Sequence, residues 1–143
     1  MIIRRKKNGF TLIELMVAVL LTGILASMGI SSYMTHNIRK QVSEGFKLAG
    51  GIQTAISQYY VRGWSMPADM NALKLPQASG QYVSSITQEK GVITITYGNN
   101  AMSKLTGGKV TLKGTDNGNG NVLWTCTPDG TIITKEYVPI SCV

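Results

Sequence analysis

The sequence predicts an α+β protein with a long protruding N-terminal helix packed on an antiparallel β-sheet of about four to five strands. Two observations predict this architecture. A helical pattern continues from residue 10 to about residue 62, apolar all round at first and then apolar on one face. Short alternating segments follow residue 81, rich in β-branched and aromatic residues and bounded by turn sequences. The length of 143 residues suits one small domain with an N-terminal extension.

The first part of the predicted helix, residues 10–32, is apolar apart from Glu14 and a few small polar residues. Such a segment suits lipid or the interior of a fibre rather than the surface of a globular domain. It also has about the ~20 residues that span the hydrocarbon core of a bilayer. A charge in that position costs roughly 2.5–3.5 kcal/mol on insertion scales, so Glu14 is predicted to have a function and a partner.

The second part of the predicted helix, residues 33–62, is amphipathic. Its expected core-facing residues recur at spacings of three, four and seven: Ile38, Val42, Ala49, Ile52, Ile56 and Tyr59. The helix is expected to end near Arg62 and Gly63, because glycine suits the left-handed position after a helix and Pro67 follows closely. Gly29 lies in a segment of low helix propensity and is expected to act as a weak hinge.

Residues 63–81 are predicted to form a connecting loop, with Trp64 and Leu73 as anchors on the core. Residues 82–143 are predicted to form the sheet. Turn sequences rich in Asn, Asp, Gly and Pro separate its segments. The expected strands are residues 82–87, 92–97, 109–113, 122–127 and 131–137.

The formal net charge of +7 does not by itself predict nucleic-acid binding, because residues 4–7 supply four of the charges. Five later lysines, Lys90, Lys104, Lys109, Lys113 and Lys135, are the basic residues that could gather on one sheet edge. Lys104, Lys109 and Lys113 are the candidate DNA contacts among them. The competing interpretation, scattered solvated lysines, is preferred because no patch is demonstrated by sequence.

The sequence contains no arrangement of residues that predicts catalysis, a metal site or a cofactor. His36 lies in the predicted helix without a neighbouring carboxylate or cysteine. Asp116, Asn117 and Asn119 lack the twelfth-position glutamate of a calcium-binding loop, so a hydrogen-bonded turn is expected there. The glycine-rich sequence at residues 107–109 lacks the spacing of a phosphate-binding loop.

Cys126 and Cys142 are the two cysteines of the chain. An even number of cysteines in an exported chain predicts one disulfide formed in an oxidising compartment, with two buried free thiols as the alternative. The spacing does not fit a zinc site.

A family resemblance begins at the junction between the basic leader and the apolar segment. The sequence there resembles the class III leader junction of type IV prepilins, and the residues that carry the resemblance are Lys7-Asn8-Gly9-Phe10-Thr11-Leu12-Ile13-Glu14-Leu15. It continues more weakly through Tyr33, Arg39 and Gln41-Val42-Ser43-Glu44, and the segment from Cys126 to Cys142 resembles the disulfide-bounded region of type IVa pilins. An ordinary secretory signal and a plain membrane anchor are the competing interpretations.

The resemblance implies a major pilin of the type IVa class, with residues 1–9 as cleaved leader, 10–32 as transmembrane and filament-core helix, 33–62 as its amphipathic half, 63–81 as αβ-loop and 82–143 as sheet. It implies that a prepilin peptidase cuts after Gly9 and methylates Phe10, and that Glu14 pairs with the amine of Phe10. The implied partners are other subunits, the membrane before assembly and the inner-membrane assembly machinery of a Gram-negative bacterium. The implied final location is a pilus on the cell surface.

Three alternatives remain within this interpretation. The chain is a minor pilin, a pseudopilin of type II secretion, or a DNA-binding receptor pilin of natural transformation.

Overall fold

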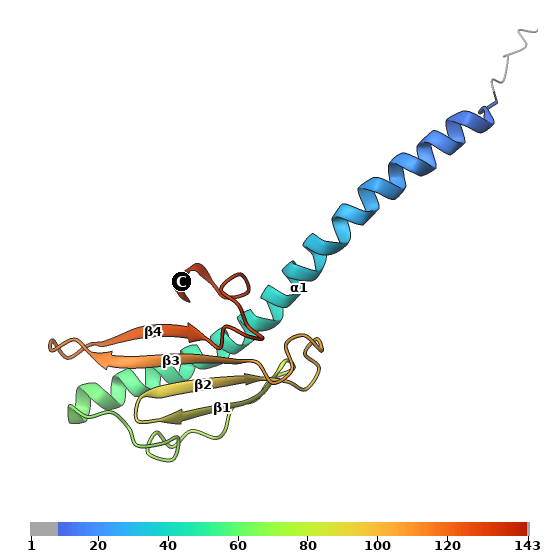
Figure 1. Cartoon of the computed structure of the whole chain (residues 1–143). Coiled ribbons are helices and arrows are strands. Elements are labelled where there is room, and N and C mark those ends of the chain that lie inside the picture. Colours follow the sequence, from blue (N-terminus) through green and yellow to red (C-terminus); the bar gives the residue numbers. More distant parts are fainter. Residues whose placement is uncertain (1–8, 143) are drawn as a thin grey trace, which may run out of the picture. The chain divides into compact units, whose positions relative to one another are not determined.

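The computed structural model describes residues 9–142 (Figure 1). The basic residues of the predicted leader, Arg4 to Lys7, lie outside the described residues. The chain forms helix α1 (Leu12–Gly63), strands β1 (Val83–Glu89), β2 (Val92–Tyr97), β3 (Lys109–Asp116) and β4 (Val122–Pro128), and a short 3-10 helix η1 (Ile140–Cys142). The predicted fold class, one long N-terminal helix with an antiparallel sheet, is confirmed. The chain forms two compact units, Met1–Thr35 and His36–Val143.

The first unit contains the apolar part of α1. The helix begins at Leu12 rather than at Phe10, because Thr11 caps it. It is α-helical through Gly29 and the two serines that follow. The weak hinge predicted at Gly29 is therefore not a break in this structure, and its behaviour in a filament stays a prediction.

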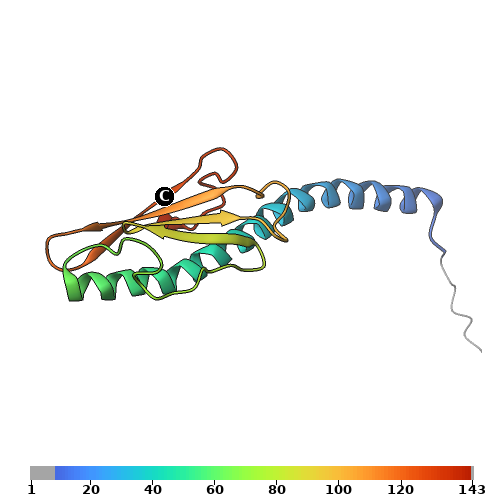
Figure 2. The same cartoon turned by 90° about the horizontal axis from the view of Figure 1, so that it is seen from below.

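The second unit is a four-stranded antiparallel meander with the amphipathic part of α1 against one face (Figure 2). The helix buries one stripe of residues: Ile38, Val42, Gly45, Ala49, Ile52, Ile56 and Tyr60. Tyr59, predicted to face the core, is 38% exposed, whereas Tyr60 is 4% exposed. That prediction was wrong because positions three and four residues after Ile56 both fit the helical period, and the core takes the fourth.

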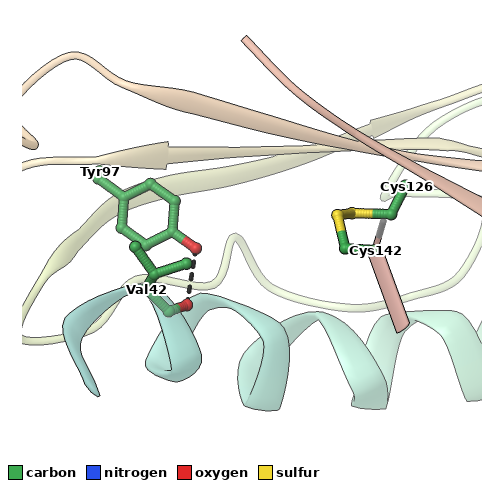
Figure 3. The surroundings of a disulfide bond; sticks show 4 residues. All are labelled: Val42, Tyr97, Cys126 and Cys142. Atoms are coloured by element: carbon green, nitrogen blue, oxygen red, sulfur yellow. Dashed lines mark hydrogen bonds between the residues drawn. A yellow bond between two sulfur atoms is a disulfide. The ribbon is translucent and has the colours of Figure 1, made fainter. Parts of the chain in front are cut away.

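Gly45 lets the sheet lie close to the helix. A Cβ atom added at Gly45 would meet the ring of Tyr97 at 2.9 Å and the Cγ2 atom of Ile95 at 2.8 Å. The Tyr97 hydroxyl donates a 2.8 Å hydrogen bond to the Val42 carbonyl across this contact (Figure 3). Burial, reinforced by the Glu44 carboxylate, raises the pKa of Tyr97, so its hydroxyl remains a donor.

The αβ-loop is fastened to the second unit by hydrogen bonds and by packing. At its C-terminal end, the Glu44 carboxylate accepts hydrogen bonds from the backbone N–H groups of Gln81 and Tyr82 at 2.8 and 2.7 Å. Leu73 packs against the core as predicted. Trp64 does not serve as the predicted anchor: it is 69% exposed and stacks edge-on with Tyr60.

Residues 131–137 do not form the predicted fifth strand. The carboxylate of Asp129 accepts hydrogen bonds from the backbone N–H groups of Thr131, Ile132 and Ile133 at 3.1, 3.0 and 2.8 Å. These donors are the ones that a strand would offer to a neighbour, so the segment turns instead. Ile133 still reaches the core, which explains the misleading alternation.

Candidate assembly site

Thr11 and Glu14 form a capping box at the start of α1. The Glu14 carboxylate accepts hydrogen bonds from the backbone N–H and the hydroxyl of Thr11 at 2.9 and 2.8 Å. In return, the Glu14 backbone N–H donates to the Thr11 hydroxyl oxygen at 3.4 Å. This is the reciprocal arrangement of the sequence pattern threonine-x-x-glutamate, and it satisfies N–H groups that have no partner within the helix.

The capping box gives Glu14 a partner that sequence reasoning missed, although the spacing of Thr11 and Glu14 is a readable signal. The predicted partner was the amine of Phe10. In the uncleaved chain the nitrogen of Phe10 is a peptide nitrogen, because Gly9 precedes it. The predicted ion pair therefore requires cleavage, and Thr11 holds the carboxylate in the chain as it stands.

The apolar part of α1 offers a continuous exposed surface. The large side chains of this segment, together with Phe10 just before the helix, are each at least half exposed: Phe10, Leu12, Ile13, Leu15, Met16, Val17, Val19, Leu20, Leu21, Ile24, Leu25, Met28 and Ile30. The helix is long and apolar enough to cross a membrane. An exposed apolar surface of this extent marks a membrane or protein interaction site.

The C-terminal tail, residues 136–142, is held against the rest of the second unit by a disulfide and by a hydrogen bond. Cys126 on β4 and Cys142 on η1 are bonded with a Cα–Cα distance of 4.8 Å, which confirms the predicted disulfide (Figure 3). Arg39 of α1 donates from its Nε atom to the carbonyl of Glu136 at 2.7 Å. The tail also buries Val138 against the core.

The candidate DNA-contacting lysines do not share a sheet edge. Lys109 and Lys113 lie on β3, which is an interior strand between β2 and β4. Both are exposed on the face of the sheet opposite α1, four residues and therefore ~13 Å apart along the strand. Lys104 is exposed in the loop between β2 and β3. The predicted edge is corrected to an outer face, because the even spacing places both lysines on one side of the strand.

The outer face around these lysines is rich in hydroxyl groups. Thr96 lies opposite Lys109, and Val92 and Thr125 lie on either side of Lys113. A row of four threonines crosses the sheet between the two lysines: Thr87, Thr94, Thr111 and Thr127.

Other polar residues singled out by the sequence have local structural roles. Asp116 accepts a 2.7 Å hydrogen bond from the backbone of Gly118, and Asn117 accepts one of 3.0 Å from Asn119, both within the β3–β4 turn. His36 is an exposed residue of α1. Over residues 9–142, histidine, cysteine and carboxylate side chains do not group in a way that would hold a metal ion.

The exposed apolar segment, the amphipathic segment packed on an antiparallel sheet and the disulfide at the C-terminus are the features that the resemblance to type IV pilins implies. Comparison with known families agrees. Residues 39–143 match the family described as pilin of a bacterial filament, and residues 4–30 match the prokaryotic N-terminal methylation motif. The chain belongs to the pilin family.

Relatives share most of their length with this chain. The fimbrial protein EcpC of Eikenella corrodens is 37% identical, with 98% of this chain and 93% of the relative aligned. The type IV major pilin protein PilE of Neisseria gonorrhoeae is 34% identical over 84% of this chain and 74% of the relative. A fimbrial protein of Moraxella nonliquefaciens is 32% identical over 93% and 94%. The chain is thus a structural subunit of a type IV pilus with an N-methylation motif.

Proposed function

We propose that this chain is the major pilin of a type IVa pilus, made as an inner-membrane precursor and assembled into a homopolymeric filament. The observation that carries the proposal is the carboxylate of Glu14 at the start of α1, within an apolar segment whose large side chains are at least half exposed. A bilayer covers that helix before assembly, and the helices of other copies cover it afterwards. The lipid bilayer and the core of the fibre are alternative apolar surroundings for the same helix surface. The filament can therefore extend by taking subunits from the membrane and retract by returning them to it.

The assembly mechanism is an exchange of partners at Glu14. Prepilin peptidase removes residues 1–9 and methylates the new amine at Phe10, which is then positively charged. After cleavage the helix is free to extend back to Phe10, which would place Phe10 and Glu14 at positions i and i+4 of one helix face, so the pair is accessible within one chain as well as between neighbouring copies. In apolar surroundings an ion pair offsets a desolvation cost of several kcal/mol, whereas a hydrogen bond from Thr11 leaves the negative charge uncompensated. An incoming subunit is thereby drawn to the register that pairs the two charges.

The subunit interface is of the heterologous kind. One surface patch of a subunit meets a different patch of the next, and such contacts generate helical fibres when they do not close. The chain acts as a substrate of the peptidase and as a building block, without a catalytic role of its own. Adhesion and twitching motility are the functions that such a fibre supports.

A comparison of filament yield with membrane-bound subunit tests this proposal. Glu14→Ala is expected to insert and to be cleaved normally, because insertion becomes easier without the charge. It is expected to give few surface filaments. Ser27→Ala is the matched control: its hydroxyl lies in the same apolar segment and donates to the carbonyl of Ile24 at 2.8 Å. Wild-type filament yield from Glu14→Ala would overturn the role of the carboxylate in assembly.

The outer face of the sheet supports a second candidate function, weak DNA binding during uptake. Lys109 and Lys113 share that face with threonine hydroxyls, and lysine and threonine both contact phosphates in protein–DNA complexes. Sheared filaments are to be titrated with duplex DNA at several salt concentrations. A double Lys109→Gln and Lys113→Gln variant is expected to weaken binding and to lower the salt slope by about 0.9 per lost phosphate contact. Unchanged binding by that variant would exclude this face.

A further inference from the structure

A pocket of about 440 Å³ lies between the last two turns of α1 and the αβ-loop. The helix contributes Gln58, Tyr59 and Arg62 to its lining, and the following chain contributes Ser65, Leu73 and Lys74. Its volume lies within the range of small-molecule sites. All the residues that line the pocket belong to the second unit, and they are remote in sequence from Phe10 and Glu14.

The loop wall of the pocket is held by its own hydrogen bonds. Asp69 accepts from the backbone N–H of Ala72 at 2.9 Å and from the side chain of Asn71 at 3.2 Å. The backbone N–H of Lys74 donates to the carbonyl of Asn71 at 2.9 Å. This turn gives Lys74 a positive φ of 55°, an uncommon conformation for lysine, so the position of the residue is imposed by the turn.

The same loop is fastened to the sheet. The side chain of Gln88, which is 4% exposed, donates to the carbonyl of Pro67 at 2.9 Å. The backbone N–H of Lys90 donates to the carbonyl of Ala68 at 3.0 Å. Both walls of the pocket are therefore parts of the folded unit, which favours a preformed site.

The charge of the pocket favours an anion. Arg62 and Lys74 both line it, and none of the described lining residues is a carboxylate. Arg62 also lies in the last turn of α1, where a positive charge complements the helix dipole. Lys74 lies in the loop, where it has no helix dipole to complement. Two cations at one concave site raise the local concentration of anions, and a guanidinium group matches the planar geometry of a carboxylate.

The remaining lining residues suit a hydroxylated ring. Tyr59 is 38% exposed and lines the pocket, whereas the adjacent Tyr60 belongs to the core. A tyrosine ring offers a flat apolar surface with a polar tip. Gln58 and Ser65 add an amide and a hydroxyl that donate and accept hydrogen bonds. A sugar ring has both an apolar C–H face and hydroxyl groups, and a sugar acid adds the carboxylate that the cations require.

We propose that this pocket, defined by Arg62 and Lys74, binds an acidic sugar, with its carboxylate at the two cations and its ring beside Tyr59. The site goes beyond the filament function and does not depend on it. It would give each pilin copy a ligand-binding site of its own.

Ligand-observed NMR on the full processed chain in detergent micelles tests the proposal, with glucuronate as probe and glucose as its uncharged analogue. Glucuronate is expected to bind and glucose to bind at least tenfold more weakly. Arg62→Gln and Lys74→Gln are each expected to weaken glucuronate binding by about tenfold, in keeping with the usual strength of a charged hydrogen bond. Lys47→Gln changes an exposed lysine of the same helix outside the pocket and is expected to bind as the wild type does. The variants alter exposed residues, and near-UV circular dichroism checks that each remains folded.

Three results would overturn the proposal: no saturation transfer to glucuronate, equal binding by the pocket variants and the control, or equal binding of acetate and glucuronate. Equal binding of acetate and glucuronate would show that the pocket recognises only the negative charge and not the sugar ring. Glucuronate binding is also to be measured on sheared filaments, to show whether the pocket stays open after assembly. Binding that persists in filaments supports a free sugar as the ligand, whereas loss of binding there would show that assembly closes the pocket and would overturn its role as a ligand site of the pilus.

Discussion

Replacing Gly45 by alanine tests whether the close contact between α1 and the sheet holds the second unit together. The new Cβ atom would meet Tyr97 and Ile95 at 2.8–2.9 Å, and both of these side chains are buried in the core, so at least one of them must shift. Overpacking of this kind costs about 1–3 kcal/mol. Loss of the 2.8 Å hydrogen bond from Tyr97 to Val42 adds about 1 kcal/mol. The better helix propensity of alanine offsets about 1 kcal/mol.

The net expectation is a decrease of about 1–3 kcal/mol in the free energy of unfolding, which corresponds to roughly 4–12 °C in the unfolding temperature of a domain of this size. Gly51→Ala is the matched control on the same helix, because a Cβ atom there has nothing within 4 Å. That variant is expected to gain up to about 1 kcal/mol. The measurement is thermal unfolding of the full chain in detergent micelles, followed by near-UV circular dichroism. Equal stability of the two alanine variants would show that the close contact at Gly45 does not limit the stability of the unit.

Gly9→Val is expected to block removal of residues 1–9, because a peptidase binds extended backbone closely at the scissile bond; a normal processed mass would contradict this. Cys126→Ser is expected to destabilise the second unit by about 3 kcal/mol, and reduction of the wild type with dithiothreitol should lower its unfolding temperature equally. Partial burial by itself raises the pKa of Asp129, but four backbone N–H donors outweigh it and hold the pKa below its ordinary value. Its stabilising effect is then fully present above about pH 4 and is lost as the pH falls through the lowered pKa, so Asp129→Asn should flatten the acid side of the stability profile. Parallel acid profiles of wild type and variant would count against that assignment.

The helix and most of the sheet are predictable from the sequence because period and turn chemistry agree there. The apolar period from Ile38 to Ile56 is enough to identify the buried stripe of the helix. Four of the five expected strands exist, each bounded by turn residues. The junction at Gly9 and the carboxylate of Glu14 identify the family by motif, and the comparisons agree.

The failures have local physical causes. The alternation of residues 131–137 predicts a strand, but one carboxylate, Asp129, takes up the N–H groups that a strand would need. The helical period of the apolar residues does not show whether Tyr59 or Tyr60 is the one that faces the core. Gly45 looks like a weak point in the helix, and only the position of Tyr97, more than fifty residues later, shows why a side chain is excluded there.

The assembly site was half predicted. Glu14 was recognised by its charge in apolar surroundings, whereas Thr11 was overlooked although threonine and glutamate at this spacing form a readable cap. The alternative with the lysines on a sheet edge is wrong because strand order is not encoded in the local sequence pattern. β3 turned out to be an interior strand, which places Lys109 and Lys113 on a face.

Mass spectrometry of filaments sheared from the cell surface is the decisive test of the proposed role as major pilin. We expect the abundant protein to be this chain beginning at an N-methylated Phe10, with the disulfide between Cys126 and Cys142 intact. Trace amounts beside another dominant pilin would contradict its role as the major subunit. Filaments that contain the chain with residues 1–9 still attached would contradict the proposed exchange of partners at Glu14.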